Sequence, residues 1–586
     1  MPAPRFIAAA FATLLALGFA TSAMAQGCDA LRAACKTAGF VEGGASGGNG
    51  VAANCLNPLL NGTKPPGNGK LALPVVAADT IAACTADKAK GSKTSKTGKT
   101  KGVTASTLGA SRVAPGPMPV AALPLPAGTA PGPNIVVVLV DDFSLDLMTT
   151  QNGVLAASMP NLARMQKEGV TFTKYFVTDS LCCPSRTSLF TGLLPHNSGV
   201  YTNTPPDGGF AGFMTNGDDA KTFAVALHQQ FYQTAMMGKY LNGYQPDQNG
   251  VPQGWSDWAV AGNGYPNFNY VLNQNGALTT SPLHLTDQLS ALGQDFIKQA
   301  AAGPFFLEIA TFSPHAPYTP PARYADAFPD LTYPKTPAYG ARPDARAPTW
   351  LKAIPALDQK TMDNIDEIYR NRVRSDKGVD DMIGAVRQKL ADLGLSATTY
   401  VIFTSDNGYH MGEYSLRPGK MTPFDTDIRV PLVVVGPGIA AGGTVDAITM
   451  NIDFYPTFTE LAGLPANANV DGRSLVALLH GKPGPWRNIA VVEHKNTVPD
   501  PENPDLTGPK AGNPPTYVAL RLPDAMYVEY EGGEVGYYDL KSDPHQLANI
   551  AGTLSSDRLK ALHEAVVANH GCVGATACAA AQNLTP

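Results

Sequence analysis

The chain has 586 residues, of which 44% are hydrophobic and 16% are charged, whereas roughly 25% of the residues in ordinary soluble proteins are charged. This length accommodates one large α/β domain with a smaller partner, or several domains. The formal net charge of −5 at pH 7 provides no strongly basic field, which argues against a protein that binds nucleic acid with its whole surface.

Residues 1–25 are typical of a cleavable export signal. A single basic residue, Arg5, precedes the apolar run FIAAAFATLLALGFA, and AMA at residues 23–25 forms a cleavage site of the A-x-A type. The run is short for a membrane span. A lipid anchor on Cys28 is the alternative, although AQGC lacks the usual leucine. We therefore expect a periplasmic or secreted protein with no transmembrane segment.

Six of the eight cysteines are expected to form three disulfides, because the chain is predicted to be exported. Four of them fall in a small cysteine-rich region at residues 26–86, where three pairings are open, and two close a small loop near the C-terminus. A zinc site in the N-terminal region is the alternative, but no CxxC pair or nearby histidine supports it. The six are Cys28, Cys35, Cys55, Cys84, Cys572 and Cys578.

Residues 87–133 are expected to form a flexible linker. Its first part repeats lysine among Gly, Ser and Thr, and the stretch from Val113 to Pro133 is rich in proline. Such a composition cannot bury enough apolar surface to fold. Binding of an anionic surface is the alternative to a plain solvated tether. No aromatic residues are interleaved with the lysines, so we expect no nucleic-acid partner.

A large α/β domain is expected over residues 134–484. NIVVVLV (134–140) and TYVIFTSDN (399–407) are continuous apolar runs of the kind buried on both faces of a parallel sheet. MPNLARMQKEG (159–169) has helical spacing and a terminal glycine, and GVDDMIGAVRQKLADLG (378–394) is amphipathic. DIRVPLVVVGPG and NIDFYPTFTELAG continue the alternation of strand and helix. The predicted fold class is therefore α/β, with a doubly wound sheet.

The sequence pattern changes from about Pro485 onward. Three short alternating runs, YVALRL, AMYVEY and VGYYDL, follow one another within residues 485–586. Such runs predict a small antiparallel sheet, and we expect this C-terminal subdomain to pack on the main domain.

Oxygen-bearing side chains follow two of the predicted strands. VVVLVDD ends in Asp141 and Asp142, and VIFTSDN ends in Asp406 and Asn407. Ligands of open α/β sheets gather at the carboxyl ends of the strands, and three converging carboxylates would repel one another without a cation. All-oxygen donors favour a hard cation such as Ca²⁺ or Mg²⁺ over zinc. Taken alone, each pair is equally typical of an ordinary turn.

The segment CCPSRTSLFTG, which begins at Cys182, resembles the C-x-P-S-R…T-G signature of the type I, formylglycine-dependent sulfatases of the alkaline-phosphatase-like superfamily. Other landmarks resemble that family in the family's order: NIVVVLVDD, MPNLARMQKEGVTFTKYF, GKYLNGY, SPHAPYTPP, SDNGYHMGEYSLRPGK and DIRVPLVVVGPG. The resemblance covers about residues 134–550. GKYLN, GWSDW, SDNGYH and EYSL look closest to the N-acetylglucosamine-6-sulfatase branch and its extracellular heparan-sulfatase relatives.

The resemblance implies that Cys182 is the catalytic position. In the family, a formylglycine-generating maturation enzyme oxidises the first cysteine of the motif to an aldehyde. The hydrated aldehyde attacks the sulfate sulfur, and the resulting sulfated hemiacetal expels sulfate. Cys183 occupies the variable position and is expected to be a small packed side chain. A vicinal disulfide between the two cysteines is the alternative, and it leaves the rest of the motif unexplained.

The resemblance also implies roles for the other site residues. Arg186 would stabilise the deprotonated nucleophile, Lys239 and Lys420 would bind the sulfate group, and His315 would protonate the leaving oxygen as a general acid. One Ca²⁺ is expected, with Mg²⁺ as the alternative. Its implied ligands are Asp141, Asp142, Asp406, Asn407 and the modified Cys182.

One position departs from the arylsulfatase pattern. Many arylsulfatases have a histidine two residues after the lysine equivalent to Lys239, and here that residue is Leu241. The base that collapses the hemiacetal is therefore expected elsewhere, and His410 in DNGYH is predicted for that role. His196 in LLPHNSGVY is predicted to support the helix that carries the nucleophile.

The function expected from these features is an exported sulfuric-ester hydrolase that acts on a carbohydrate 6-sulfate such as N-acetylglucosamine-6-sulfate. The alternatives are an arylsulfatase, a phosphodiester or phosphonate monoester hydrolase of the same superfamily, and a non-catalytic binder of sulfated glycans. The expected partners are a sulfated carbohydrate or aryl sulfate and the maturation enzyme. Loops at residues 201–220 and 495–516 are expected to influence substrate choice.

Overall fold

The computed structural model describes residues 35–36, 132–145, 157–262, 266–482, 484–498 and 508–584. The predicted signal peptide, and nearly all of the cysteine-rich region and linker, lie outside these residues, so the predicted segment boundaries stay predictions. Cys35 is described, and it is buried and disulfide-bonded. The predicted disulfide between Cys572 and Cys578 is present. Within the described part of the chain, no helix is both long and apolar enough to cross a membrane.

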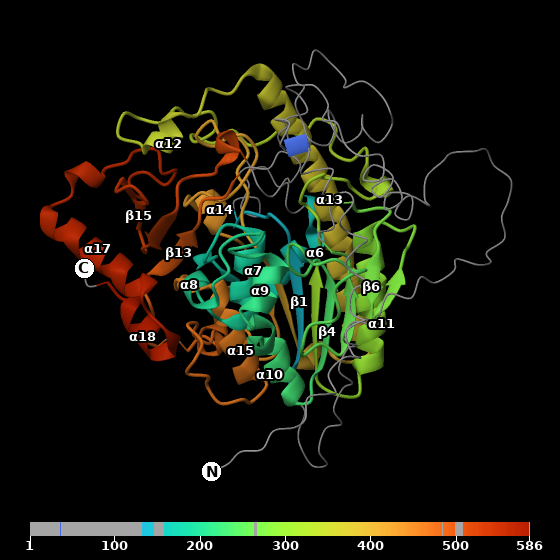
Figure 1. Cartoon of the computed structure of the whole chain (residues 1–586). Coiled ribbons are helices and arrows are strands. Elements are labelled where there is room, and N and C mark those ends of the chain that lie inside the picture. Colours follow the sequence, from blue (N-terminus) through green and yellow to red (C-terminus); the bar gives the residue numbers. More distant parts are fainter. Residues whose placement is uncertain are drawn as a thin grey trace, which may run out of the picture. The chain divides into compact units, whose positions relative to one another are not determined.

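A ten-stranded mixed sheet forms the centre of the main domain, in the order β11-β2-β10-β9-β1-β8-β4-β5-β6-β7 (Figure 1). The five strands from β9 to β5 are parallel, and both ends of the sheet include antiparallel pairs. The strands are β1 Asn134–Val140, β2 Val170–Phe172, β4 Gln233–Gly238, β5 Asp257–Val260, β6 Leu272–Gln274, β7 Ala277–Thr279, β8 Phe305–Ala310, β9 Thr399–Ser405, β10 Leu432–Val435 and β11 Gly443–Val445.

Helices cover both faces of this sheet, which confirms the predicted fold class. Alternate residues of β1 enter two separate hydrophobic cores, with Ile135, Val137 and Leu139 in one and Val136 and Val138 in the other. The first core includes residues of α7 (Cys182–Thr191), α10 (Phe223–Gln229) and α15 (Phe454–Leu461). The second includes residues of α6 (Pro160–Glu168), α11 (Leu285–Ala300) and α13 (Gln359–Asp392).

The two helices predicted from single segments are both present. The segment at 159–169 forms α6, and the segment at 378–394 is the C-terminal half of the longer α13. The smaller elements around them are β3 (Tyr175–Phe176), which pairs with β12 (Thr449–Met450), and the short helices α8 (Pro195–Ser198), α9 (Gly209–Thr215), α12 (Thr349–Lys352), α14 (Asp425–Ile428) and α16 (Val476–Leu479).

The C-terminal subdomain contains a four-stranded antiparallel sheet, as predicted, in the order β13-β14-β15-β16. The three alternating runs form β14 (Tyr517–Arg521), β15 (Ala525–Tyr530) and β16 (Val535–Asp539), and β13 (Ala490–His494) is a fourth strand that was not predicted. Helices α17 (Ser556–His570) and α18 (Gly574–Ala581) follow. Figure 1 shows these elements beside α8, on one side of the large sheet.

A largely buried ion pair connects the C-terminal sheet to the main domain. Arg521 of β14 donates through Nε to Asp425 Oδ1 at 2.8 Å and through Nη2 to Asp425 Oδ2 at 3.0 Å. Burial opposes ionisation of Asp425, but Arg521 outweighs it and lowers the pKa of this carboxyl. The pair therefore stabilises the fold above the ordinary pKa of an aspartate, and this contribution is lost as the pH falls through the lowered value.

We expect Arg521→Met to destabilise the protein by about 1–3 kcal/mol, between the costs for exposed and fully buried pairs, because it leaves the largely buried Asp425 with only the weaker contact to Arg429. Urea unfolding at neutral pH measures the change. Arg323 forms a similar two-point ion pair with Asp287, but its side chain is 41% exposed, so Arg323→Met should cost less than about 1 kcal/mol. Equal losses for the two variants would contradict this role of the buried pair.

Candidate active site

Parallel strands bring the predicted site residues to one edge of the large sheet. β9, β1, β8 and β4 are consecutive neighbours in that order, and all run in the same direction. Their carboxyl ends therefore lie side by side, where ligand sites of α/β sheets are found. The residues that follow these ends are Asp141 and Asp142 after β1, Asp406 and Asn407 after β9, Lys239 after β4 and His315 after β8.

Cys182 is the first residue of α7, so it lies at the N-terminal end of that helix. Its buried Sγ is 2.9 Å from Lys420 Nζ and 3.5 Å from Asp141 Oδ1. Burial and the charge of Asp141 raise the pKa of this thiol well above its ordinary value, although Lys239 and Lys420 oppose the shift.

The neighbouring Cys183 belongs to the hydrophobic core on the α7 side of the sheet. Its backbone N–H donates to Asn203 Oδ1 at 2.9 Å. The two adjacent cysteines do not form a disulfide with each other. Cys183 is therefore the small packed side chain that the sequence predicted.

Arg186 lies one turn after Cys182 and is completely buried. Its Nε donates to Asp406 Oδ2 at 2.8 Å, and its Nη1 donates to the backbone carbonyl of Lys239 at 2.7 Å. Lys239 Nζ in turn donates to Asp141 Oδ2 at 2.6 Å. Burial opposes ionisation of Asp141, but Lys239 and the neighbouring cations outweigh it and hold the pKa of this carboxyl below its usual range.

Asn407 has a buried amide oxygen that suits a cation. Its Nδ2 donates to Asp142 Oδ1 at 2.7 Å and to the carbonyl of Gly408 at 2.8 Å. Its Oδ1 is buried without a hydrogen-bond partner among the described residues. A buried oxygen of this kind calls for an ion or a water molecule. Together with the carboxylates around it, it provides the hard donors that Ca²⁺ and Mg²⁺ prefer.

The predicted metal ligands lie in two adjoining groups, and the first consists of Asp406 and Asn407. Asp406 accepts the backbone N–H of Asn407 on Oδ1 at 2.8 Å, in addition to its contact with Arg186. The same Oδ1 accepts the backbone N–H of Asp142 at 3.1 Å, which connects the two groups. The other group has its ligand atoms within 4.8 Å of one another and consists of Asp141, Asp142, Cys182 and His315. His315 thus lies among the predicted ligands, although the sequence indicated a different role for it.

The imidazole of His315 has a defined orientation. Its Nδ1 is 2.8 Å from the carbonyl oxygen of Ala316, and a carbonyl can only accept, so Nδ1 carries a hydrogen. Its Nε2 is then the nitrogen that faces the site, 3.6 Å from Asp142 Oδ2. This orientation presents Nε2 for proton exchange with a bound molecule.

His410 is not part of the ligand group. Its Nδ1 is 2.9 Å from both carboxylate oxygens of Asp427, and its backbone pairs with that of Gly419. Burial lowers the pKa of this imidazole, but Asp427 outweighs burial, so the net shift is upward. Nε2 is buried without a hydrogen-bond partner among the described residues, and the contacts of His410 do not reach Cys182.

Two further residues hold the site in place and were not found from the sequence. Arg372 of α13 donates to the backbone carbonyl of Asp142 and lies 4.5 Å from the ring centre of Tyr409. Asp427 orients His410 and also accepts from Thr422 Oγ1 at 2.6 Å. Arg372 lies in no local pattern that distinguishes it from an ordinary surface charge. Asp427 is the first residue of DIRVPLVVVGPG, a segment that resembles a family landmark but that indicated no role for this aspartate.

The family is shown by comparison with known proteins. A family model described as Sulfatase matches residues 133–464, more than half of the chain. The N-acetylglucosamine-6-sulfatase of Capra hircus is 33% identical over 490 residues, which cover 77% of this chain and 86% of that protein. The extracellular sulfatase SULF-1 homolog of Drosophila melanogaster is 30% identical over 357 residues, which cover 59% of this chain and 31% of that protein.

A solved structure shares the fold. It is the complex of a protein with its substrate D-glucosamine-2-N,6-O-disulfate, and it matches with a TM-score of 0.61 at 22% identity, covering 74% of this chain and 97% of that protein. The part of the chain matched by the family model, residues 133–464, includes the segment that begins at Cys182 and the strands that surround it. The chain therefore belongs to the sulfatase family and has the alkaline-phosphatase-like fold of that family.

Proposed function

We propose that this sulfatase-family hydrolase is exported, uses a formylglycine formed from Cys182 together with one divalent cation, and removes 6-sulfate groups from N-acetylglucosamine-like sugars. The observation that supports the proposal best is the position of Cys182. Its side chain is buried at the N-terminal end of α7, between Lys420 and Asp141. The modified residue would supply an oxygen nucleophile there.

The cation in this proposal is Ca²⁺, with Mg²⁺ as the alternative. When bound, it would supply positive charge that favours the ionised nucleophile. The buried Oδ1 of Asn407, which lacks a donor among the described residues, supports a cation at this place. The residues that would hold it are Asp141, Asp142, Asp406, Asn407 and the modified residue 182.

Lys239 and Lys420 would bind the sulfuryl oxygens. Both side chains are buried, and each ammonium group is fixed by a carboxylate, Asp141 for Lys239 and Asp142 for Lys420. Donors that are fixed before the reaction stabilise developing charge without reorganisation. Arg186, held by its two hydrogen bonds, would stabilise the ionised nucleophile from the helix side.

Two histidines would move protons. His315 would protonate the leaving sugar oxygen through Nε2, because its Nδ1 hydrogen is committed to the carbonyl of Ala316. His410 stays our candidate for the base that releases sulfate, with Asp427 orienting it and Nε2 as the accepting atom. Since the contacts of His410 do not reach Cys182, this role requires a bridging water or a movement of the substrate-bound site.

The proposed substrate and location have separate support. A relative that is 33% identical is named N-acetylglucosamine-6-sulfatase. This name supports a 6-sulfated N-acetylglucosamine as the substrate. Export is supported by the predicted signal at residues 1–25 and by the disulfide between Cys572 and Cys578, a bond that persists in oxidising compartments. A formylglycine-generating enzyme of the host would be the maturation partner.

We expect Cys182→Ala to abolish sulfate release, whereas Cys183→Ala should retain most of it. The first variant loses the nucleophile, and the second removes a sulfur that belongs to the hydrophobic core. Mass spectrometry of the peptide that contains both cysteines should locate the aldehyde at residue 182, from an expression host that has the maturation enzyme. Full turnover by Cys182→Ala, or an aldehyde at residue 183, would contradict the proposal.

A panel of substrates tests the specificity. N-acetylglucosamine-6-sulfate should be hydrolysed with a higher kcat/KM than an aryl sulfate, and both should be better substrates than an aryl phosphonate monoester. A sugar sulfated only at another position serves as the matched control for the 6-sulfate. A higher kcat/KM for the phosphonate ester would support the alternative reaction. A higher kcat/KM for the aryl sulfate than for the sugar sulfate would overturn the sugar assignment.

We expect His315→Ala to lower kcat by about 100- to 10,000-fold on a sugar sulfate, the usual contribution of a general acid. The loss should be much smaller on an aryl sulfate with an acidic leaving group, because such a leaving group needs no proton. Leaving-group dependence of kcat for wild-type and variant enzyme provides the measurement. A uniform loss across all leaving groups would show that His315 acts as a ligand or positioning residue instead.

A further inference from the structure

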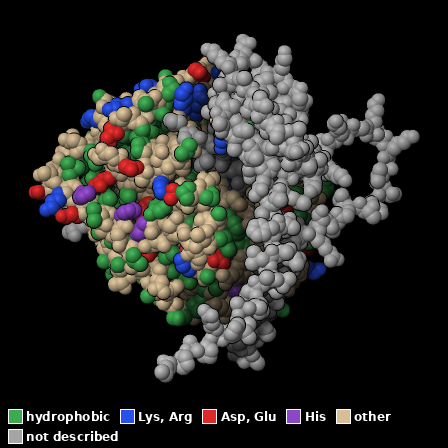
Figure 2. Space-filling model, viewed as in Figure 1, with side chains coloured by type: hydrophobic (Ala, Val, Ile, Leu, Met, Phe, Trp, Pro, Cys, Tyr) green, Lys and Arg blue, Asp and Glu red, His purple; other side chains and the backbone are tan. Residues whose placement is uncertain are grey.

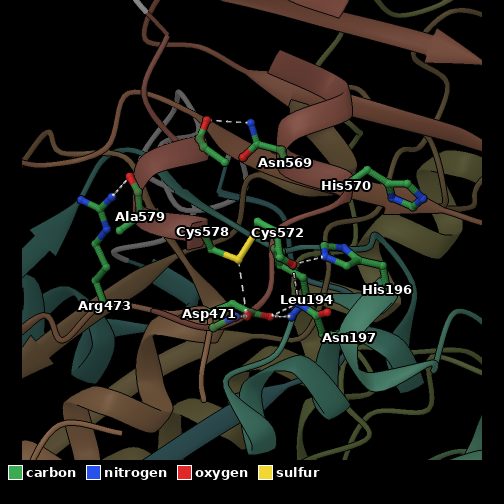
Figure 3. Close-up of a disulfide and its surroundings, with 12 residues drawn as sticks. Leu194, His196, Asn197, Asp471, Arg473, Asn569, His570, Cys572, Cys578 and Ala579 are labelled. Carbon is green, nitrogen blue, oxygen red and sulfur yellow. Dashed lines mark hydrogen bonds between the residues drawn. A yellow bond between two sulfur atoms is a disulfide. The ribbon is translucent and has the colours of Figure 1, made fainter. Parts of the chain in front are cut away.

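A second group of metal-ligating side chains lies outside the site described above. It consists of His196 of α8, Glu493 of β13 and His570, the last residue of α17. These elements join the segment after the nucleophile helix to the C-terminal sheet. Figure 2 shows histidine side chains at the surface over the region of α8 and α17, and Figure 3 shows the rings of His196 and His570 beside the Cys572–Cys578 disulfide.

The two imidazoles converge on one carboxylate oxygen. His196 Nδ1 is 2.7 Å and His570 Nδ1 is 2.8 Å from Glu493 Oε1. All three ligand atoms lie within 4.8 Å of one another. A tetrahedral zinc ion holds such atoms at about 2.0–2.2 Å from itself, so binding requires the three atoms to spread by roughly half an ångström.

The tautomer of His196 favours a cation at this point. Its Nε2 lies 2.8 Å from the carbonyl oxygen of Cys572, which can only accept, so Nε2 carries a hydrogen. In the neutral ring, Nδ1 then directs a lone pair at the carboxylate of Glu493. Only a proton or a metal ion between them removes the repulsion. A ring N–H donated to a carbonyl is also the usual way in which metal-binding histidines are oriented.

The surroundings favour a metal ion and allow it to enter. Glu493 is buried, and both burial and the charge of Glu493 raise the pKa of the nearby buried Asp179. The carboxyl groups of Glu493 and Asp179 therefore lie close enough to interact on the inner side of the cluster. His570 lies at the C-terminal end of α17, where the helix dipole favours positive charge. Its side chain is 49% exposed, which leaves a route from solvent.

We propose that His196, Glu493 and His570 bind Zn²⁺ at a second metal site that connects α8 to the C-terminal subdomain. Two imidazole nitrogens and one carboxylate oxygen suit zinc better than the hard cation of the proposed active site. A water molecule on the exposed side of His570 completes the coordination. Binding replaces the hydrogens on the two Nδ1 atoms, so up to two protons leave for each Zn²⁺ bound.

The test uses the full chain with Ca²⁺ in excess and Zn²⁺ as the probe. Isothermal titration calorimetry in two buffers of different ionisation enthalpy should find one Zn²⁺ site with release of protons, and Zn²⁺ should raise Tm. His570→Ala should weaken Zn²⁺ binding by more than about 100-fold. This loss is larger than the one expected from removing a residue that only orients a metal ligand. His570 is partly exposed, so the variant should fold.

His563→Ala is the matched control, because His563 lies on the same helix, is 61% exposed and also faces a carboxylate, with Nδ1 3.0 Å from Glu529 Oε1. It should bind Zn²⁺ like the wild type. Equal binding by His570→Ala and the wild type would place the ion elsewhere and overturn the proposal. Absence of Zn²⁺ binding by the wild type would show that protons alone hold the cluster together. Neither the Zn²⁺ titration nor the Tm measurement depends on sulfate release. The result of this test is therefore independent of whether the proposed function is correct.

Discussion

Carboxylates buried together at the ends of β1 and β9 are the constraint on which the rest of the active-site structure depends. Asp141, Asp142 and Asp406 are each 1% exposed, and buried like charges are costly unless cations face them. Three buried cationic side chains contact these acids, namely Arg186, Lys239 and Lys420. Their placement explains why basic residues from a helix, a strand end and a distant loop converge on one edge of the sheet.

This balance of charge also explains how the proposed reaction fits the same place. The three acids and three bases already compensate one another, so a bound divalent cation leaves an excess of positive charge. That excess attracts an anion into a site of low dielectric. A sulfate ester supplies one negative charge and the ionised nucleophile supplies a second. These two negative charges would offset the charge of the cation, which lowers the cost of burying it among the six side chains.

The sequence could predict what depends on local patterns. A continuous apolar run indicated β1, and the residues after such a strand must lie at its carboxyl end, so Asp141 and Asp142 could be placed. Direction is not encoded in that pattern, and β10 proved antiparallel to β9. All five residues of β13 are buried, so it lacks the alternation that indicated its neighbours. Arg372 acts through a contact with Asp142, which is distant in sequence and which only the folded chain brings close. Asp427 contacts the nearby His410 and Thr422, but residue types alone did not indicate that pairing.

The position of Cys182 depends on both ends of one helical segment. Gly192 ends α7 in a left-handed conformation, with φ of 71°, where an added Cβ would lie 2.9 Å from the Cβ of Tyr455. The chain therefore turns sharply into α8, and the backbone N–H and ring of His196 are both held by Glu493. Because Glu493 belongs to β13, the C-terminal sheet fixes the direction in which α7 leaves the active site. That sheet is thus part of the scaffold of the nucleophile, although it contains none of the proposed catalytic residues.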